Sequence, residues 1–124
     1  MVDVVVRSEA GNRITHIGDV QTNETIIDAG PETIAQLAPY VMAAKTILWN
    51  GPLGLYESGA PGSTHALAKL VAESNAFSVL GGGDTVAAIE DLGLNEEFGF
   101  VSTGGGAMLT VLEAGTTPAL QALE

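Results

Sequence analysis

The chain has 124 residues, of which 46% are hydrophobic and 5% aromatic, so we expect one domain with an aliphatic core. It contains no cysteine, which excludes disulfides and thiolate metal sites and fits a cytoplasmic location. A net charge of −11 argues against a nucleic-acid-binding surface, which needs a basic stripe. We find no apolar run long enough to span a membrane and expect no signal peptide at the start.

The first third of the chain predicts short strands followed by a helix. Three segments rich in β-branched residues predict the strands: Val2–Val6, an edge strand at Arg13–Ile17, and Thr25–Asp28. A helix is expected to begin at Pro31, because proline is tolerated at the first helical position. Pro39 falls inside the apolar pattern of this helix, and we expect it to kink or end the helix near Ala38.

The rest of the chain alternates strands with helices. The predicted strands are Lys45–Trp49, Phe77–Leu80 and Phe98–Ser102. The predicted helices are Ser63–Ser74, capped by Ser63; Thr85–Leu92, ended by Gly93; Ala107–Ala114, ended by Gly115; and a last turn over Pro118–Leu123. Alternation of this kind predicts an α/β fold with a mainly parallel sheet covered on both faces.

Glycine-rich loops follow three of the predicted strands: Asn50–Gly54, Gly81–Asp84 and Thr103–Gly106. In a parallel sheet the carboxyl ends of the strands meet at one edge, where ligands bind. We therefore expect the three loops to face a common crevice.

The loop at Gly81–Asp84 has the composition of a phosphate site. Gly82 and Gly83 allow the backbone to approach a ligand closely, and the helix that follows offers unpaired amides to phosphate oxygens. Asp84 is then a candidate ligand for a Mg²⁺ ion carried by a nucleotide. The alternative is that Asp84 is only an N-cap and the glycines only form a tight turn. The loop is neither a Walker motif nor a G-x-G-x-x-G fingerprint.

The other two loops have both a functional and a structural interpretation. Gly104, Gly105 and Gly106 are candidate donors around a transferring phosphoryl group, although a plain turn explains such a loop taken alone. In the first loop, Asn50 offers an amide beside the rigid Pro52, and Glu57 can accept hydrogen bonds from ribose hydroxyls. The alternative for Glu57 is a solvated surface position.

The remaining chemistry-bearing side chains have simpler interpretations. His16 and His65 are isolated from any nucleophile or carboxylate spacing, so we expect both at the surface. Trp49 is expected in the core.

Three segments together resemble phosphoglycerate kinase: KTILWNGPLGLYE (Lys45–Glu57), FSVLGGGDTVAAIEDLGL (Phe77–Leu94) and VSTGGGAMLTVLEAG (Val101–Gly115). The segments VDVVV and TIIDAGPETI fit the region before them, so the resemblance covers essentially the whole chain. It implies that residues 1–124 form the latter part of the family's C-terminal nucleotide-binding domain. That domain is a Rossmann-like, three-layer α/β/α fold, present here in part.

The resemblance also implies roles for the loop residues. Glu57 matches the ribose-binding glutamate, and Asn50 and Pro52 match residues that line the nucleotide site. Gly82, Gly83, Asp84 and Thr85 match the segment that holds the phosphates of ADP or ATP, with Asp84 toward Mg²⁺. Gly83, Gly104, Gly105 and Gly106 match residues near the transferred phosphoryl group. The implied reaction is the glycolytic transfer of phosphate between 1,3-bisphosphoglycerate and ADP, giving 3-phosphoglycerate and ATP.

Several features depart from the family pattern. Tyr56 stands where the family usually has Phe, and Gly62-Ser63-Thr64 interrupts the usual Gly-Thr pair. The 124 residues also do not match the N-terminal lobe that binds phosphoglycerate, the hinge, the lysines that contact the nucleotide, or the terminal tail. We therefore expect this chain to carry the Mg-nucleotide side only and to be inactive alone. The alternatives are a non-catalytic nucleotide-binding module and a structural fragment that self-associates through exposed apolar surface.

Overall fold

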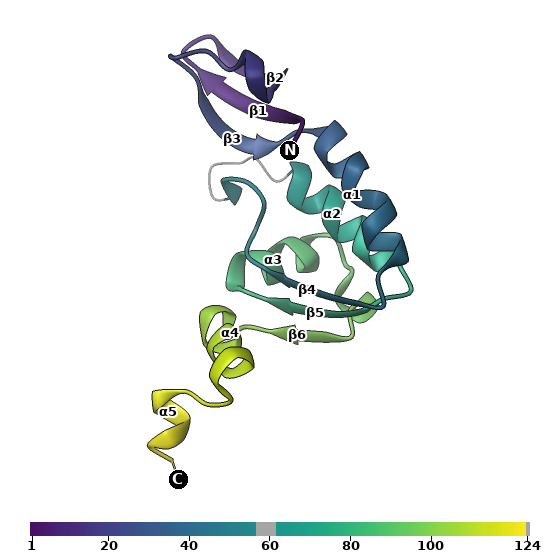
Figure 1. The fold of residues 1–124 in the computed structure, drawn as a ribbon, viewed down its shortest axis with the longest axis vertical. Helices are drawn as coiled ribbons and strands as arrows, with labels where there is room; N and C mark the ends of the chain where they lie inside the picture. The colour runs from purple at the N-terminus through teal and green to yellow at the C-terminus, as the bar shows by residue number, and fades with distance from the viewer. Residues whose placement is uncertain (57–61, 124) are drawn as a thin grey trace.

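A computed structural model describes residues 1–56 and 62–123 of the chain. The molecule is elongated, with a small antiparallel sheet at one end, a parallel sheet in the middle, and the C-terminal helix at the other end (Figure 1). Two helices, α1 and α2, pack against each other and connect the two sheets. None of the helices in the described residues is long and apolar enough to cross a membrane.

The antiparallel sheet consists of the first three strands, β1 (Asp3–Ser8), β2 (Gly11–His16) and β3 (Thr25–Ala29), in the order β2-β1-β3. All three strands were expected, but they do not join the parallel sheet. Only Glu9 and Ala10 separate β1 from β2, which permits an antiparallel hairpin and no parallel crossover between these two strands. Val4 and Val6 of β1 are completely buried.

Helix α1 (Pro31–Ala43) starts against this sheet. The carboxylate of Asp3 accepts hydrogen bonds from the amides of Glu32 (3.0 Å) and Thr33 (2.7 Å) at the helix start. Burial by itself would raise the pKa of Asp3, but these bonds outweigh it and hold the pKa below its ordinary value. The helix continues through Pro39 to Ala43, so it does not end near Ala38, and the alternative of a kink there stays a prediction. Packing of α1 against α2 compensates for the amide that proline lacks.

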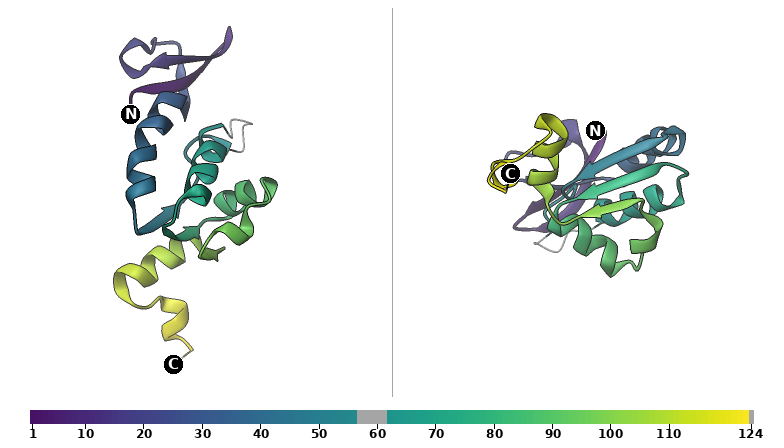
Figure 2. Two further views of the ribbon diagram at one scale, coloured as in Figure 1. Left: turned by 90° about the vertical axis from the view of Figure 1, so that its right-hand side faces the viewer. Right: turned by 90° about the horizontal axis from the view of Figure 1, so that it is seen from below.

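The parallel sheet consists of β4 (Thr46–Asn50), β5 (Phe77–Gly81) and β6 (Phe100–Ser102), in the order β4-β5-β6. Helices α2 (Gly62–Glu73) and α3 (Gly83–Asp91) cover one face (Figure 2). The core lies between this face and the helices and is formed by Trp49, Leu67, Ala68, Val71, Leu80, Ile89 and Phe98. The predicted α/β class, its parallel sheet and the core position of Trp49 are confirmed.

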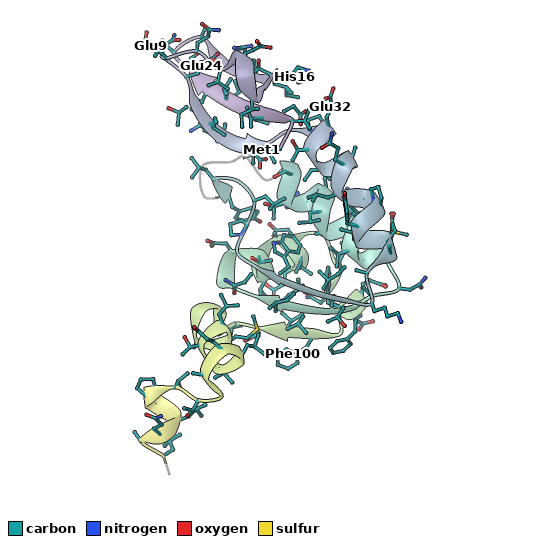
Figure 3. All side chains as sticks on the ribbon, in the orientation of Figure 1. Met1, Glu9, His16, Glu24, Glu32 and Phe100 are labelled. Carbon is teal, nitrogen blue, oxygen red and sulfur yellow. The ribbon has the colours of Figure 1, made fainter. Side chains whose placement is uncertain are left out.

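The opposite face of the parallel sheet is only partly covered by the described residues. Helix α4 (Gly105–Ala114) places Met108 over Gly81 at the end of β5. Elsewhere on this face, Leu48, Phe77 and Phe100 are each more than half exposed. Figure 3 shows the Phe100 side chain directed away from the sheet, on the side opposite α2 and α3.

The remaining elements are short. Helix α5 (Pro118–Gln121) is capped by the Thr117 hydroxyl, and 3-10 turns occur at Ile17–Asp19 and Asn95–Glu97. Gly93 and Gly115 follow α3 and α4 with left-handed φ values of 67° and 75°, as expected for helix-ending glycines.

Candidate functional site

The three glycine loops lie at the same end of the parallel sheet, which we call the carboxyl edge. Asn50 of β4 pairs with Gly81 of β5, and Gly81 pairs with Ser102 of β6, so the three strands end level with one another. Beyond the strands the loops meet: a Cβ atom at Gly105 would lie only 3.4 Å from the Cα of Gly82. The predicted common edge is therefore observed.

The first loop is fixed by one hydrogen bond to its own backbone and one to the end of β5. The indole of Trp49 donates to the carbonyl of Gly51 (2.7 Å), and the amide of Gly51 donates to the carbonyl of Gly81 (3.2 Å). These bonds place the side-chain oxygen of Asn50 among the glycines. It would lie 2.6 Å from a Cβ atom at Gly81 and 3.8 Å from one at Gly82. A side chain at Gly81 would therefore displace the Asn50 amide, whereas one at Gly82 would only contact it.

The second loop opens helix α3. Gly82 is the N-cap, with a φ of 99°, and its carbonyl accepts the first helical hydrogen bond from Val86 (3.0 Å). The amides of Gly83, Asp84 and Thr85 precede that bond and therefore have no partner within the helix. Because Gly82 caps the helix, the alternative role of Asp84 as an N-cap is wrong. Asp84 is exposed in the first turn.

Thr85 is the most unusual polar residue at this edge. It is completely buried, and its hydroxyl has no hydrogen-bond partner among residues 1–56 and 62–123. Buried hydroxyls without a partner are rare in folded proteins, so this one calls for a physical explanation.

The third loop offers fewer amides to a ligand than its three glycines suggested. The amide of Gly104 donates to the Ser102 hydroxyl (3.1 Å), and the Gly104 carbonyl accepts from Ala107 (2.8 Å). Gly106 is exposed. Gly105, with a φ of 40°, is the residue that contacts Gly82 and opens α4.

The segment after the half-buried Pro52 is held by three different elements. The amide of Leu53 donates to the hydroxyl of Thr64 on α2 (3.0 Å), and the amide of Leu55 donates to the carbonyl of Ile27 on β3 (2.8 Å). Tyr56 donates its hydroxyl to Asp91 on α3 (2.7 Å), and this bond raises the pKa of Tyr56 above its ordinary value. Glu57, the expected ribose ligand, lies outside the described residues.

Two buried polar residues beside this segment were missed by the sequence analysis. Asp28 accepts the Ser63 amide (3.1 Å) and the Ser63 hydroxyl, so Asp28 rather than Ser63 caps α2. Thr64 shares the buried stripe of α2 with Leu67 and Val71 and is itself 0% exposed. A threonine within an apolar stripe is a signal that could have identified Thr64, because a buried hydroxyl needs a partner.

The two histidines differ from each other. His16 is exposed, as expected, whereas His65 is half-buried, which corrects its assignment to the surface. The ring of His65 meets the ring of Tyr56 edge-on at 6.1 Å. Its Nε2 is buried and has no partner in the described part of the chain.

The family model of phosphoglycerate kinase matches residues 1–115, which is most of the chain. This chain belongs to the phosphoglycerate kinase family. Phosphoglycerate kinase from Coxiella burnetii has 45% sequence identity and a TM-score of 0.84 over 98% of this chain and 33% of that chain. The enzyme from Pyrococcus horikoshii OT3 has 34% identity and a TM-score of 0.82 over 98% of this chain and 31% of that chain. The chain thus spans about a third of the length of these solved phosphoglycerate kinases.

The geometry of the carboxyl edge predicts different effects at two adjacent glycines. Gly82→Ala forces an L side chain to a φ of 99°, so we expect it to lower the free energy of unfolding by about 1–3 kcal/mol. Gly83→Ala meets open space without a positive φ, so we expect a change within about 1 kcal/mol, in the stabilising direction. Urea unfolding of both variants checks this, and equal effects would contradict the assigned geometry.

Proposed function

We propose that this chain provides the Mg-nucleotide side of the phosphoglycerate kinase reaction. In that reaction a phosphoryl group passes between 1,3-bisphosphoglycerate and ADP, giving 3-phosphoglycerate and ATP. The observation that carries the proposal is the contact between Gly82 and Gly105 beside the Asn50 amide, in a member of this family. The proposal makes the protein a phosphotransferase of glycolysis acting in the cytoplasm.

The charge distribution favours binding of the phosphates by the backbone. Lys45 precedes β4 and therefore lies at the opposite end of the parallel sheet, and Arg7 and Arg13 lie in the antiparallel sheet. The amides of Gly83, Asp84 and Thr85 are directed out of the start of α3, where the helix dipole also favours an anion. The buried Thr85 hydroxyl is a further donor for a phosphate oxygen.

The residues at the carboxyl edge also fit a Mg²⁺ ion that arrives with the nucleotide. Asp84 is an exposed carboxylate next to the proposed phosphate position, and no group of three or more metal-ligating side chains gathers within the described ranges. Mg²⁺ sites in nucleotide enzymes take one or two carboxylates and complete their coordination with phosphates and water. The ion would supply charge stabilisation to the transferred group.

The nucleoside is assigned to the first loop. Asn50 and Pro52 would line its site, and Glu57 follows Tyr56 directly in the sequence, where it would accept the ribose hydroxyls. Tyr56 is itself fixed to α3 through Asp91. On the phosphoryl side, Gly83, Gly105 and Gly106 would donate amides toward the transferred group, whereas the Gly104 amide is already bonded to Ser102.

We predict that the 124-residue chain alone forms no ATP from 1,3-bisphosphoglycerate and Mg-ADP. Phosphoryl transfer depends on holding both reactants in line, and such positioning accounts for about 7–11 kcal/mol of a barrier. The residues assigned here hold only the nucleotide. A coupled assay for ATP checks this, and turnover by the pure chain would contradict the division of roles.

We predict that Mg-ADP binds to the chain and that Asp84→Ala removes the Mg²⁺-dependent part of the affinity, by about tenfold or more. Isothermal titration with and without Mg²⁺ measures this. Glu90→Ala is the matched control, since Glu90 is exposed near the other end of the same helix. Equal losses in both variants, or no heat from the unmodified chain, would refute the magnesium assignment.

A further inference from the structure

A buried carboxylate at the end of β3 lies outside the proposed nucleotide contacts. Asp28 is only 4% exposed. Its Oδ1 accepts the amide of Ala29 (2.8 Å) and the hydroxyl of Ser63, and its Oδ2 accepts the amide of Ser63 (3.1 Å). A buried charge is costly unless several donors compensate it, so this arrangement has to be built by the surrounding residues.

One route from Asp28 to the first loop runs through α2. The bonds to Ser63 fix the first turn of that helix to β3. The next residue, Thr64, is completely buried and accepts the Leu53 amide (3.0 Å). The position of Leu53 is therefore set by the helix start that Asp28 holds.

A second route is direct contact. A Cβ atom at Gly54 would overlap the carboxylate of Asp28 and would lie 2.9 Å from the carbonyl of Ile27. The same carbonyl accepts the Leu55 amide (2.8 Å). Residues 53–55 are thus enclosed between β3 and the start of α2, and the Asp28 carboxylate is at the centre of these contacts.

We propose that Asp28 is a positioning residue for the nucleoside side of the site, acting through residues 53–55 and not by touching the ligand. This inference rests on the proposed function. In the described ranges, no hydrogen bond joins Asp28 to the phosphate-side residues 82–85. Loss of Asp28 should therefore affect recognition of the nucleoside and leave recognition of the polyphosphate intact.

Asp3 offers a matched control in the same sheet. It is 3% exposed and accepts the amides of Glu32 and Thr33 at the start of α1, as Asp28 accepts an amide at the start of α2. Outside its sheet, the hydrogen bonds of Asp3 go to Gly30, Glu32 and Thr33 and not to residues 53–55. Asp28→Asn and Asp3→Asn both disturb a buried carboxylate at a helix start, so a general loss of stability should appear in both.

The test compares the binding of Mg-ADP and Mg-tripolyphosphate to the full chain and to these two variants. We expect Asp28→Asn to weaken Mg-ADP binding by about tenfold or more, since small displacements of a binding group have large effects. Tripolyphosphate binding should change by less than about twofold, because it needs only the phosphate side. Asp3→Asn should leave the ratio of the two affinities unchanged. A ratio that is unchanged in Asp28→Asn, or equally changed in Asp3→Asn, would overturn the proposal.

A second readout does not depend on nucleotide binding. Amide hydrogen exchange at Leu53 and Leu55 should accelerate in Asp28→Asn by about tenfold relative to amides of β1, and not in Asp3→Asn. Ser63→Ala keeps the carboxylate and removes one bond, so it should give a smaller change in the same direction if Asp28→Asn does not fold. Unaltered exchange at both leucines would refute the positioning role. If the unmodified chain binds neither ligand, the proposed function fails, while this exchange measurement still decides the role of Asp28.

Discussion

The close approach of two backbone turns, at Gly82 and Gly105, is the constraint on which the proposed site depends. Both turns also require glycine, because Gly82 and Gly105 have φ values of 99° and 40°, a backbone conformation that residues with side chains rarely adopt. The approach places the starts of α3 and α4 beside each other, and we propose that main-chain amides from both helices act on one ligand. An anion of the size of a phosphate suits such a position.

The net negative charge of the chain means that the proposed site depends on main-chain donors. With a net charge of −11, the chain repels an anionic nucleotide at long range. Binding therefore has to come from local hydrogen-bond donors and a divalent cation. In the proposed site these elements are the exposed Asp84, the buried Thr85 hydroxyl and the first amides of α3. The buried carboxylates of Asp3 and Asp28 act differently, because each holds the start of a helix, and only Asp28 also borders the loop residues 53–55.

The sequence predicted the second half of the molecule well because its signals are local. Each strand there runs directly into glycines and a helix, and the parallel order of βα units then places all the loops at one edge. The antiparallel sheet was harder to predict from the sequence. Its strands were recognised, but their antiparallel pairing depends on the lengths of the turns between them. The cap of α2 was misassigned to Ser63 because the true cap, Asp28, is 35 residues away and no local pattern reveals such a contact. The continuation of α1 past Pro39 was missed because packing against α2 opposes the local preference of proline.

The most direct test of a shared backbone site is the response of individual amides to Mg-ADP. In a ¹H–¹⁵N correlation spectrum, we predict that the amide signals of Gly83, Asp84, Thr85 and Gly105 shift on titration, while those of β1 and β2 do not. This outcome would show main-chain donors from both turns acting on one ligand. Shifts confined to the antiparallel sheet, or a response of α3 without Gly105, would contradict the claim that the two glycine turns form a single site.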